Sequence, residues 1–475
     1  MANNIVVGVD IGSSKVTVVA ASHGQDEAGV EGLEVIGFGE VPLKLGAVVN
    51  GSVENVVQVG SAIKAALDQV SSISNLEIGV VNVSFGGMHV AVSKQSDGVI
   101  RPTSSAGDEV TVQDVAQLVN DIYRAKKDAN FEVMHVLPQY FTVDSSTGIR
   151  EPVGRPGIKL SGDFLVLSAN SQSIKRTKRS LSTADSSIVV ERLIFAPIAT
   201  GMSVLTQDEK EAGIALIDIG DHTTDLLVYQ DNIIRHVASF PVAGRHITAD
   251  LKVGCGIQAE HAEKLKKEYG TALSEKVPNN IEIIINYLSG RPPRQVLKKN
   301  VALIVEERLK EIASMVYAEI RRLNLVDDLI GGVVITGGTS NIPDIETVFK
   351  RVMTGMNVRV GLPVGLKRTP KADIVSSANY ATAVGLAWAG IHPVDERLDF
   401  TLKSTPKVAT FGAEKPSAST SNTNPWGYSS RATQAEEDTA AAKTSKGGGG
   451  WASWFSSIKN SFSSRESDGN EGGEY

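Results

Sequence analysis

Two stretches of the 475-residue sequence repeat one pattern: VDIGSSKVTVVA at residues 9–20 and IDIGDHTTDLLVY at residues 217–229. Each has an apolar run that ends in Asp-Ile-Gly, then small polar residues, then a second apolar run. The pattern predicts two β-hairpins with tight turns, and the copies lie too far apart in the chain for a solenoid repeat. We therefore expect two similar domains that face each other.

Both predicted turns are suited to bind phosphate. Gly12 and Gly220 let the backbone approach a ligand without a Cβ in the way, and convergent backbone N–H groups form a concave anion site. Asp10 and Asp218 end the first strand of each hairpin, where carboxylates suit Mg²⁺ held through its water. Hydroxyls and a mobile positive charge come from Ser13, Ser14, Thr223, Thr224 and Lys15. One such turn is explained by an ordinary hairpin, whereas two in corresponding positions favour a phosphate site.

A third element, GGVVITGGTSNIPDI at residues 331–345, predicts a buried strand, a turn and a helix. Its turn, Gly337-Gly338-Thr339, permits a flat base and ribose to lie against backbone. Taken alone, it could be a βα turn with no ligand. The order of the three elements resembles the ATPase domain that actin, sugar kinases and heat-shock chaperones share. The resemblance implies an α/β, actin-like (ribonuclease H-like) fold of two lobes with ATP between them.

Composition narrows the class of protein. Strands alternate with helices up to about residue 395, as in α/β proteins. The net charge of −7 argues against nucleic acid as a partner. Cys255 is the single cysteine, which excludes an internal disulfide and fits a reducing cytosol. The sequence contains no uninterrupted run of 18 apolar residues, so no membrane-spanning segment is predicted. Residues 403–450 are polar and aperiodic, which is typical of a disordered linker.

Further motifs indicate a family. HVLPQYFTVDSSTGIREPVG at 135–154, GRPPR at 290–294, ITGGTSNIPDI, and YATAVGLAWAG at 380–390 resemble the bacterial FtsA family of cell-division proteins. The resemblance covers roughly residues 3–395. It implies that one actin subdomain is missing and that an inserted subdomain, 1C, is present.

The resemblance also implies boundaries. These are 1–83 for subdomain 1A (completed by about 166–203 and 380–400), 84–165 for 1C, 204–240 for 2A (completed by about 330–379), 241–329 for 2B, 401–450 for the disordered linker and 451–464 for an amphipathic membrane-targeting helix.

Function is implied in the same way. Members of the family bind ATP with Mg²⁺, polymerise into actin-like filaments and tether the FtsZ ring to the cytoplasmic face of the inner membrane at the division site. Partners are then the protein itself, the C-terminal tail of FtsZ, later division proteins and lipid. We expect a nucleotide-dependent adaptor with weak ATPase activity at most, and no catalytic residue is identified. The alternatives are an FtsA-like cytosolic platform of pilus assembly machinery and a sugar kinase, for which no catalytic Asp is evident.

The family's nucleotide residues can be assigned position by position. The first loop is Asp10, Gly12, Ser13, Ser14 and Lys15, and the second is Asp218, Gly220, Asp221, His222, Thr223 and Thr224. HAEKLKKEYG at 261–270 resembles the helix at the ribose and base, which nominates Glu263, Lys266 and Lys267, although a solvated helix face explains these charges equally well. The last element supplies Gly337, Gly338 and Thr339.

The second loop departs from the family pattern at two positions. Many relatives have Gly-Gly where this chain has Asp221 and His222. A carboxylate near a γ-phosphate repels it unless a cation intervenes. The departure is therefore expected to affect the affinity for nucleotide and the rate of hydrolysis. The side chain of His222 is expected to point to solvent.

The end of the chain predicts an amphipathic helix. Its large apolar side chains fall within an arc of about 100° on a helix: Trp451, Trp454, Phe455, Ile458 and Phe462. Such a helix lies in the lipid interface. Burial of each apolar side chain in lipid gains about 1.5–3 kcal/mol of free energy. The conformational entropy that the chain loses when the helix forms offsets most of this gain. A single copy of the helix is expected to bind the membrane weakly. Many copies on one filament are expected to bind it strongly. Docking in a groove on a partner protein is the alternative.

The tail of FtsZ binds subdomain 2B in this family. That tail is partly acidic in many bacteria, so basic residues of 2B are candidates to contact it: Arg294, Lys298, Lys299 and Arg308. A solvated helix surface explains each of them equally well.

Overall fold

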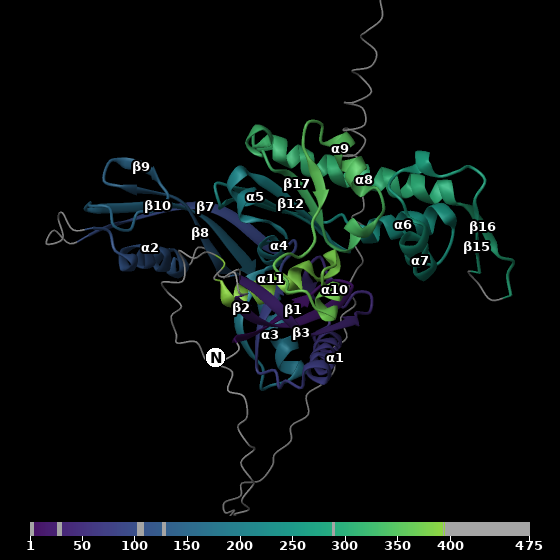
Figure 1. Ribbon diagram of the computed structural model, residues 1–475, viewed down its shortest axis with the longest axis horizontal. Coiled ribbons are helices and arrows are strands. Elements are labelled where there is room, and N and C mark those ends of the chain that lie inside the picture. The colour runs from purple at the N-terminus through teal and green to yellow at the C-terminus, as the bar shows by residue number, and fades with distance from the viewer. Residues whose placement is uncertain are drawn as a thin grey trace, which may run out of the picture. The chain divides into compact units, whose positions relative to one another are not determined.

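The computed structural model describes residues 4–25, 31–101, 109–125, 130–286, 290–392 and 394. All of them belong to one compact unit, Met1–Phe411 (Figure 1). The expected linker at 401–450 and the expected helix at 451–464, with Trp451, Trp454, Phe455, Ile458 and Phe462, lie outside the described residues.

Two five-stranded sheets with one topology form the centre of the unit. The first has the order β11–β6–β1–β2–β3 and the second β14–β13–β12–β17–β18. In each, a hairpin is extended by an antiparallel strand on one side and by two parallel strands on the other. The strands are β1 (Asn4–Ile11), β2 (Lys15–Gln25), β3 (Glu31–Pro42), β6 (Val80–Phe85), β11 (Val189–Phe195), β12 (Ile214–Ile219), β13 (Thr224–Gln230), β14 (Ile233–Phe240), β17 (Gly332–Thr336) and β18 (Val358–Val360). The prediction of two hairpins in two similar lobes is confirmed.

Burial explains why these segments form sheets. In β12, only Asp218 is not fully buried, as expected for a strand that is covered on both faces. In the first sheet, Val9 and Val18 are wholly inaccessible to solvent and belong to a core with α1 (Val56–Ser74) and α3 (Ser171–Ala184). Helix α1 begins where the Asn55 side chain accepts a hydrogen bond from the N–H of Gln58, at 3.0 Å.

Two helices of small residues join the lobes. They are α4 (Ala196–Val204) and α11 (Ala381–Ile391), which are labelled between the sheets in Figure 1. Helix α4 contacts strands of both sheets, α11 contacts strands of the first sheet, and the two helices contact each other. A Cβ at residue 385 would lie only 1.7 Å from the carbonyl oxygen of Ala199. The two helices therefore touch backbone to backbone, which glycine alone permits.

A third sheet is inserted after β6. Its order is β7–β10–β8–β9, from β7 (Val90–Ile100), β10 (Lys159–Asn170), β8 (Phe131–Val143) and β9 (Ser146–Ile149). Helix α2 (Val112–Arg124) packs on it through Leu118 and Ile122, which share a core with the sheet residues Phe141 and Phe164. This is the inserted subdomain that the family resemblance implies.

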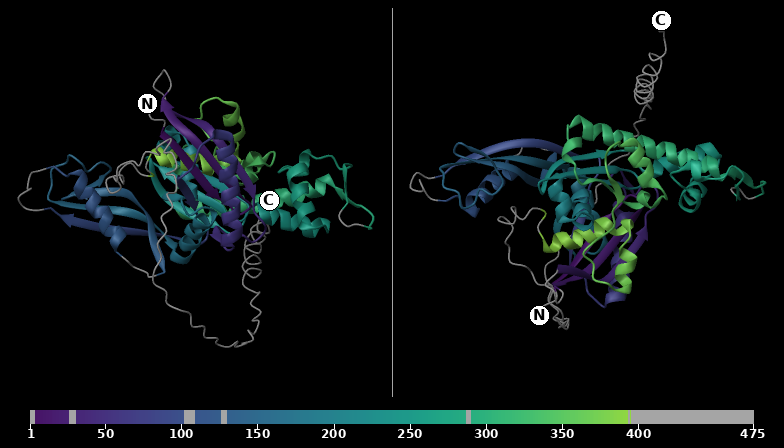
Figure 2. Two further views of the ribbon diagram at one scale, coloured as in Figure 1. Left: turned by 90° about the horizontal axis from the view of Figure 1, so that it is seen from below. Right: turned by 45° about the horizontal axis from the view of Figure 1, so that its top comes forward.

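A helical region is inserted in the second lobe after β14. It consists of α6 (Gly244–Cys255), α7 (Ala259–Tyr269), a hairpin of β15 (Glu282–Ile285) and β16 (Arg294–Leu297), and α8 (Lys298–Arg322). Cys255 is a free thiol packed in its core. Figure 2 shows this region and the inserted sheet on opposite sides of the paired lobes.

Short elements complete the described chain. They are β4 (Val48–Val49), β5 (Ser52–Val53), α5 (Gln207–Ala212), α9 (Ile345–Val352), α10 (Pro370–Val375), and 3-10 turns at Ser274–Lys276, Val326–Asp328, Gly338–Asn341 and Ala378–Tyr380. Among the described helices, none has the length and apolarity needed to cross a bilayer.

Candidate functional site

The two hairpin turns are closed by the same backbone hydrogen bond and line one cavity. The Gly12 N–H donates to the carbonyl of Lys15 at 3.1 Å, and the Gly220 N–H donates to the carbonyl of Thr223 at 3.0 Å. A cavity of about 470 Å³ is lined by both turns. The predicted site residues that line it are Asp10, Gly12, Ser13, Ser14, Lys15, Asp218, Gly220, Asp221, Glu263, Lys266, Lys267, Gly337, Gly338 and Thr339.

The first turn is able to bind an anion. Its internal hydrogen bond occupies the N–H of Gly12, while within the described part of the chain the N–H groups of Ser13 and Ser14 have no protein partner. Both serines line the cavity. Successive unpaired N–H groups in a tight turn attract negative charge.

Two half-buried carboxyl groups, Asp10 and Asp218, line the cavity. Asp10 accepts a hydrogen bond from the Ser84 hydroxyl at 2.8 Å, and Asp218 accepts one from Thr200 at 3.0 Å. Burial raises the pKa of Asp10. Burial, together with the charge of Asp225, raises the pKa of Asp218 to about 7. Several carboxyls close together in a dry site are hard to ionise unless a cation joins them, so the donor set fits Mg²⁺.

Lys15 is engaged in an ion pair across the first lobe. Its ammonium group lies 2.6 Å from the Glu40 carboxylate and 5.1 Å from the centre of the Tyr380 ring. Burial and the nearby Glu40 raise the pKa of Tyr380 to about 12. The phosphate of a ligand would therefore compete with Glu40 for Lys15.

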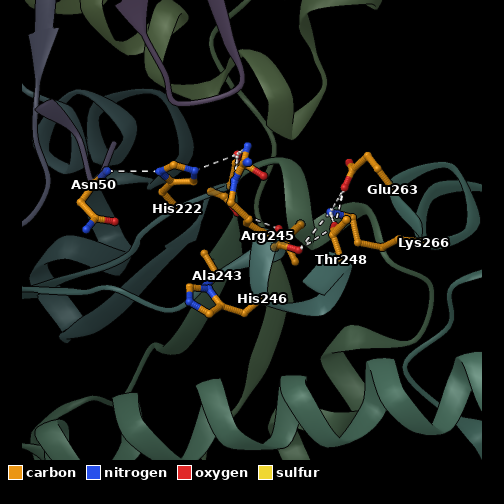
Figure 3. Close-up of polar contacts among 12 residues, drawn as sticks. Asn50, His222, Ala243, Arg245, His246, Thr248, Glu263 and Lys266 are labelled. Carbon is orange, nitrogen blue, oxygen red and sulfur yellow. Dashed lines mark hydrogen bonds and ion pairs between the residues drawn. The ribbon is translucent and has the colours of Figure 1, made fainter. Parts of the chain in front are cut away.

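Asp221 and His222 are the two side chains that the family resemblance singled out in the second turn. Asp221 forms an ion pair with Arg245, whose Nε and Nη2 lie 3.0 and 2.5 Å from one carboxylate oxygen (Figure 3). An acidic side chain beside a phosphate needs a cation to balance it, and Arg245, in the first turn of α6, supplies that charge.

The expectation that His222 points to solvent is wrong. Its side chain is 8% exposed, and its Nδ1 accepts a hydrogen bond from the Asn50 N–H of the other lobe at 3.2 Å (Figure 3). Burial and the charge of Arg245 lower its pKa, so the neutral ring is favoured. His222 does not line the cavity and instead bridges the lobes at its edge.

Thr223 and Thr224 do not line the cavity either. The Thr223 hydroxyl donates to Asp225 at 3.1 Å, and the Thr224 hydroxyl donates to the carbonyl of Val242 at 2.6 Å. Their hydroxyls satisfy groups below the turn, so they support it without facing a ligand.

The charges of α7 form a network around α6. Lys266 is buried and donates to the carbonyl of Gly244 at 3.1 Å and to the Thr248 hydroxyl at 2.9 Å (Figure 3). Glu263 lies 2.7 Å from Lys266 and 3.3 Å from Lys267. Burial opposes ionisation of Glu263, but the contacts with Lys266 and Thr248 lower its pKa on balance. Of the two lysines, Lys267 is the exposed one, at 70%.

The third turn is fixed to the second. The Thr339 hydroxyl donates to the carbonyl of Gly220 at 2.8 Å. Gly337 adopts φ +87°, and a Cβ there would lie 2.3 Å from an Asp218 carboxylate oxygen. Glycine is therefore required where the turn passes the acidic base of the cavity.

Several cavity residues were not predicted from the sequence: Glu40, Asn341, Ile342, Pro343, Ala378, Asn379 and Thr382. The segment 378–382 adjoins the motif at 380–390, which is the signal that could have found it. Glu40 carries no local signal, because its place depends on the pairing of β3 with β2.

The basic residues expected to contact a partner have different surroundings. Arg308 forms a two-nitrogen ion pair with Asp250, at 2.7 and 3.0 Å, and also contacts Glu311. Arg294 donates to the carbonyl of Gly256 at 3.2 Å, and Lys299 donates to Asn279 at 2.5 Å. Lys298 begins α8. The charge of Arg308 is thus already balanced by acidic neighbours.

Comparison with known proteins gives consistent matches. The family model "Cell division protein FtsA" matches residues 215–385, and the model "SHS2 domain inserted in FTSA" matches residues 87–168. The cell division protein FtsA of Pseudomonas aeruginosa is 31% identical over 420 residues, which are 87% of this chain and 95% of that protein. FtsA of Escherichia coli K12 is 29% identical over 393 residues, which are 81% of this chain and 90% of that protein.

Among solved structures, the "PilM-PilN type IV pilus biogenesis complex" is similar in fold. Its TM-score is 0.57 at 14% identity, over 82% of this chain and 99% of that chain. At this identity the likeness concerns the actin-like fold alone.

Proposed function

Because the chain belongs to the FtsA family of cell-division proteins, we propose that it is an ATP-binding, actin-like adaptor that polymerises and tethers the FtsZ ring to the membrane. The observation that carries the proposal is the pair of matching turns on opposite lobes of one cavity. A ligand that joins both turns links the lobes, so nucleotide state can act on subunit assembly.

In this proposal the triphosphate of ATP lies between the two turns. Ser13, Ser14 and Lys15 bind phosphate oxygens, and Gly337 and Gly338 leave room for the ribose and base. Asp10 and Asp218 would hold Mg²⁺, which neutralises charge on the β- and γ-phosphates when bound. Asp221, balanced by Arg245, is tolerated beside the phosphates. The residues of the cavity thus supply positioning and charge, which are the main needs of phosphoryl transfer to water.

Membrane attachment is assigned to the end of the chain. The apolar arc of residues 451–464 favours a helix that lies in the lipid interface. Lys459 of this segment and Arg465 just after it add little attraction to anionic lipid. Polymerisation therefore provides the avidity, and we assign the protein to the cytoplasmic face of the inner membrane at the division site.

The tail of FtsZ is assigned to the region of α6 and α8. Lys298 and Lys299 lie in the first turn of α8. Each helix also has an exposed apolar side chain, Val253 of α6 at 81% and Leu303 of α8 at 41%. A tail with both acidic and apolar residues suits such a surface. Other division proteins are further proposed partners, through the inserted sheet.

Vesicle pelleting tests the proposal. The full chain should pellet with vesicles when ATP and Mg²⁺ are present, and a chain that ends at residue 450 should remain in solution. Trp454→Ala should weaken pelleting, whereas Trp426→Ala, a matched change in the expected linker, should not.

Calorimetry with ATP tests the nucleotide step separately. Saturable, Mg²⁺-dependent uptake by both the full chain and the truncated chain is expected, because the cavity lies within residues 10–382. Absence of uptake by a folded chain would overturn the nucleotide proposal, and equal pelleting of the truncated chain would overturn the anchor.

A further inference from the structure

Three potential metal ligands meet far from the cavity between the lobes. His23 lies near the end of β2, Glu31 begins β3, and His392 directly follows α11. The Nε2 of His392 lies 2.9 Å from a Glu31 carboxylate oxygen, and the Nε2 of His23 lies 3.8 Å from the same oxygen. One ligand atom from each of the three residues falls within 4.8 Å of the others.

An unsatisfied nitrogen indicates that this cluster is incomplete as it stands. The Nε2 of His23 is buried and has no hydrogen-bond partner among the described residues. Its distance of 3.8 Å from Glu31 is too long for a hydrogen bond. A buried polar atom without a partner costs free energy, and a bound ion would remove that cost.

The rings are held in fixed orientations by an aromatic neighbour. Trp388 stacks on His392, with centroids 5.7 Å apart and planes at 24°, and meets the edge of His23 at 6.4 Å. The two imidazoles are nearly perpendicular, with centroids 6.1 Å apart. Lys367 approaches the neighbouring Gly24, and since successive strand residues face opposite sides, its ammonium lies on the other face of the sheet.

We propose that His23, Glu31 and His392 bind a divalent transition metal ion of the Zn²⁺ class. Two imidazole nitrogens and one carboxylate oxygen are a common donor set for Zn²⁺, with metal–ligand distances of about 2.0–2.2 Å. Ligands around a tetrahedral ion at those distances lie roughly 3.3 Å apart, between the two separations found here. The nitrogen donors select against Mg²⁺ and Ca²⁺.

The partial exposure of the cluster leaves a way in for the ion and an open fourth position. Glu31 is 41% and His392 35% exposed, whereas His23 is 18% exposed. The ion would join the end of α11 to the edge of the β2–β3 hairpin. It would thereby fix the last helix of the first lobe against its sheet.

The test uses the full chain, stripped with EDTA, and Co²⁺ and Zn²⁺ as probes. Co²⁺ should give visible absorption bands of a low-symmetry nitrogen–oxygen site and saturate at one ion per chain. Zn²⁺ should displace it, and excess Mg²⁺ should not. His23→Ala, His392→Ala and Glu31→Gln should each weaken binding at least about tenfold.

Matched controls separate this site from other histidines and from the cavity. His261→Ala changes a histidine of α7 whose Nδ1 is also buried and unpaired but which, among the described residues, belongs to no such cluster, and it should leave binding unchanged. Asp218→Asn should also leave it unchanged.

Trp388 provides a second readout. Bound Co²⁺ should quench its fluorescence, and Trp388→Phe should abolish that quenching while the absorption bands remain. Absence of saturable binding by the stripped, folded chain would overturn the proposal. So would unchanged affinity in both His23→Ala and His392→Ala.

Discussion

Arg245 neutralises Asp221 at the edge of the cavity, through two nitrogens at 3.0 and 2.5 Å from one carboxylate oxygen. The two residues stand 24 positions apart in the chain. This contact explains how an acidic side chain can occupy a turn that lines a proposed phosphate site.

Arg245→Ala is expected to weaken ATP binding about tenfold, because an unpaired carboxylate would repel the phosphates. The double variant Arg245→Ala with Asp221→Gly should recover most of the affinity, since it removes both charges. Titration calorimetry of the four proteins forms a double-mutant cycle. Equal losses in the single and the double variant would show that Arg245 acts on the nucleotide directly.

Glu40→Gln is expected to strengthen binding of ATP several-fold. Lys15 is paired with Glu40 at 2.6 Å, and removal of the acidic charge frees the ammonium for phosphate. Lys15→Ala should weaken binding. Glu34→Gln, on the same strand but outside the cavity, is the matched control. If Glu40→Gln weakened binding instead, Glu40 would have to contact the nucleotide itself.

Asp218→Asn is expected to stabilise the unliganded protein in alkaline buffer. The pKa of Asp218 is raised from 3.8 to about 7 on folding, so the folded state holds a proton that the unfolded chain releases. Its contribution to stability is therefore lost as pH rises from about 4 to about 7. The gain in Tm of the variant should be larger at pH 8 than at pH 5, by about 2 °C or more.

The same variant separates stability from ligand binding. ATP with Mg²⁺ should raise the Tm of the parent chain by mass action and should raise that of Asp218→Asn much less. A Tm difference that does not vary with pH would show that Asp218 stays ionised in the folded protein.

Gly385→Ala is expected to destabilise the fold by about 1–3 kcal/mol. The added Cβ would lie 1.7 Å from the carbonyl oxygen of Ala199, so α4 and α11 would have to separate. Gly79→Ala is the control, because no atom lies within 4 Å of a Cβ there. Urea denaturation measures the free energy of unfolding of both variants. Similar midpoints for the two would contradict the backbone contact between α4 and α11.

Local patterns predicted the parts of the site that local sequence determines. The turns at Gly12, Gly220 and Gly337 each require small residues at fixed spacing after a buried strand, and the structure brings all three to one cavity. The inserted subdomain and the FtsA family followed from longer motifs and are confirmed by the comparisons.

Contacts between distant segments could not be predicted in this way. The sequence around His222 does not reveal that the Asn50 N–H, from the other lobe, covers it. Lys266 has the composition of a solvated helix face, but the fold buries it under α6. In each case the deciding partner lies more than twenty residues away, where periodicity and turn chemistry carry no information.

The backbone contact between Gly385 and Ala199 has a mechanical consequence. Because the two helices touch without intervening side chains, we expect little sliding between them, and a tilt of one lobe against the other would turn about this crossing. Points far from a pivot move further than points near it. In the proposed filament, a small tilt between the lobes would therefore be larger at the β15–β16 strands and at the outer edge of the inserted sheet than at the cavity.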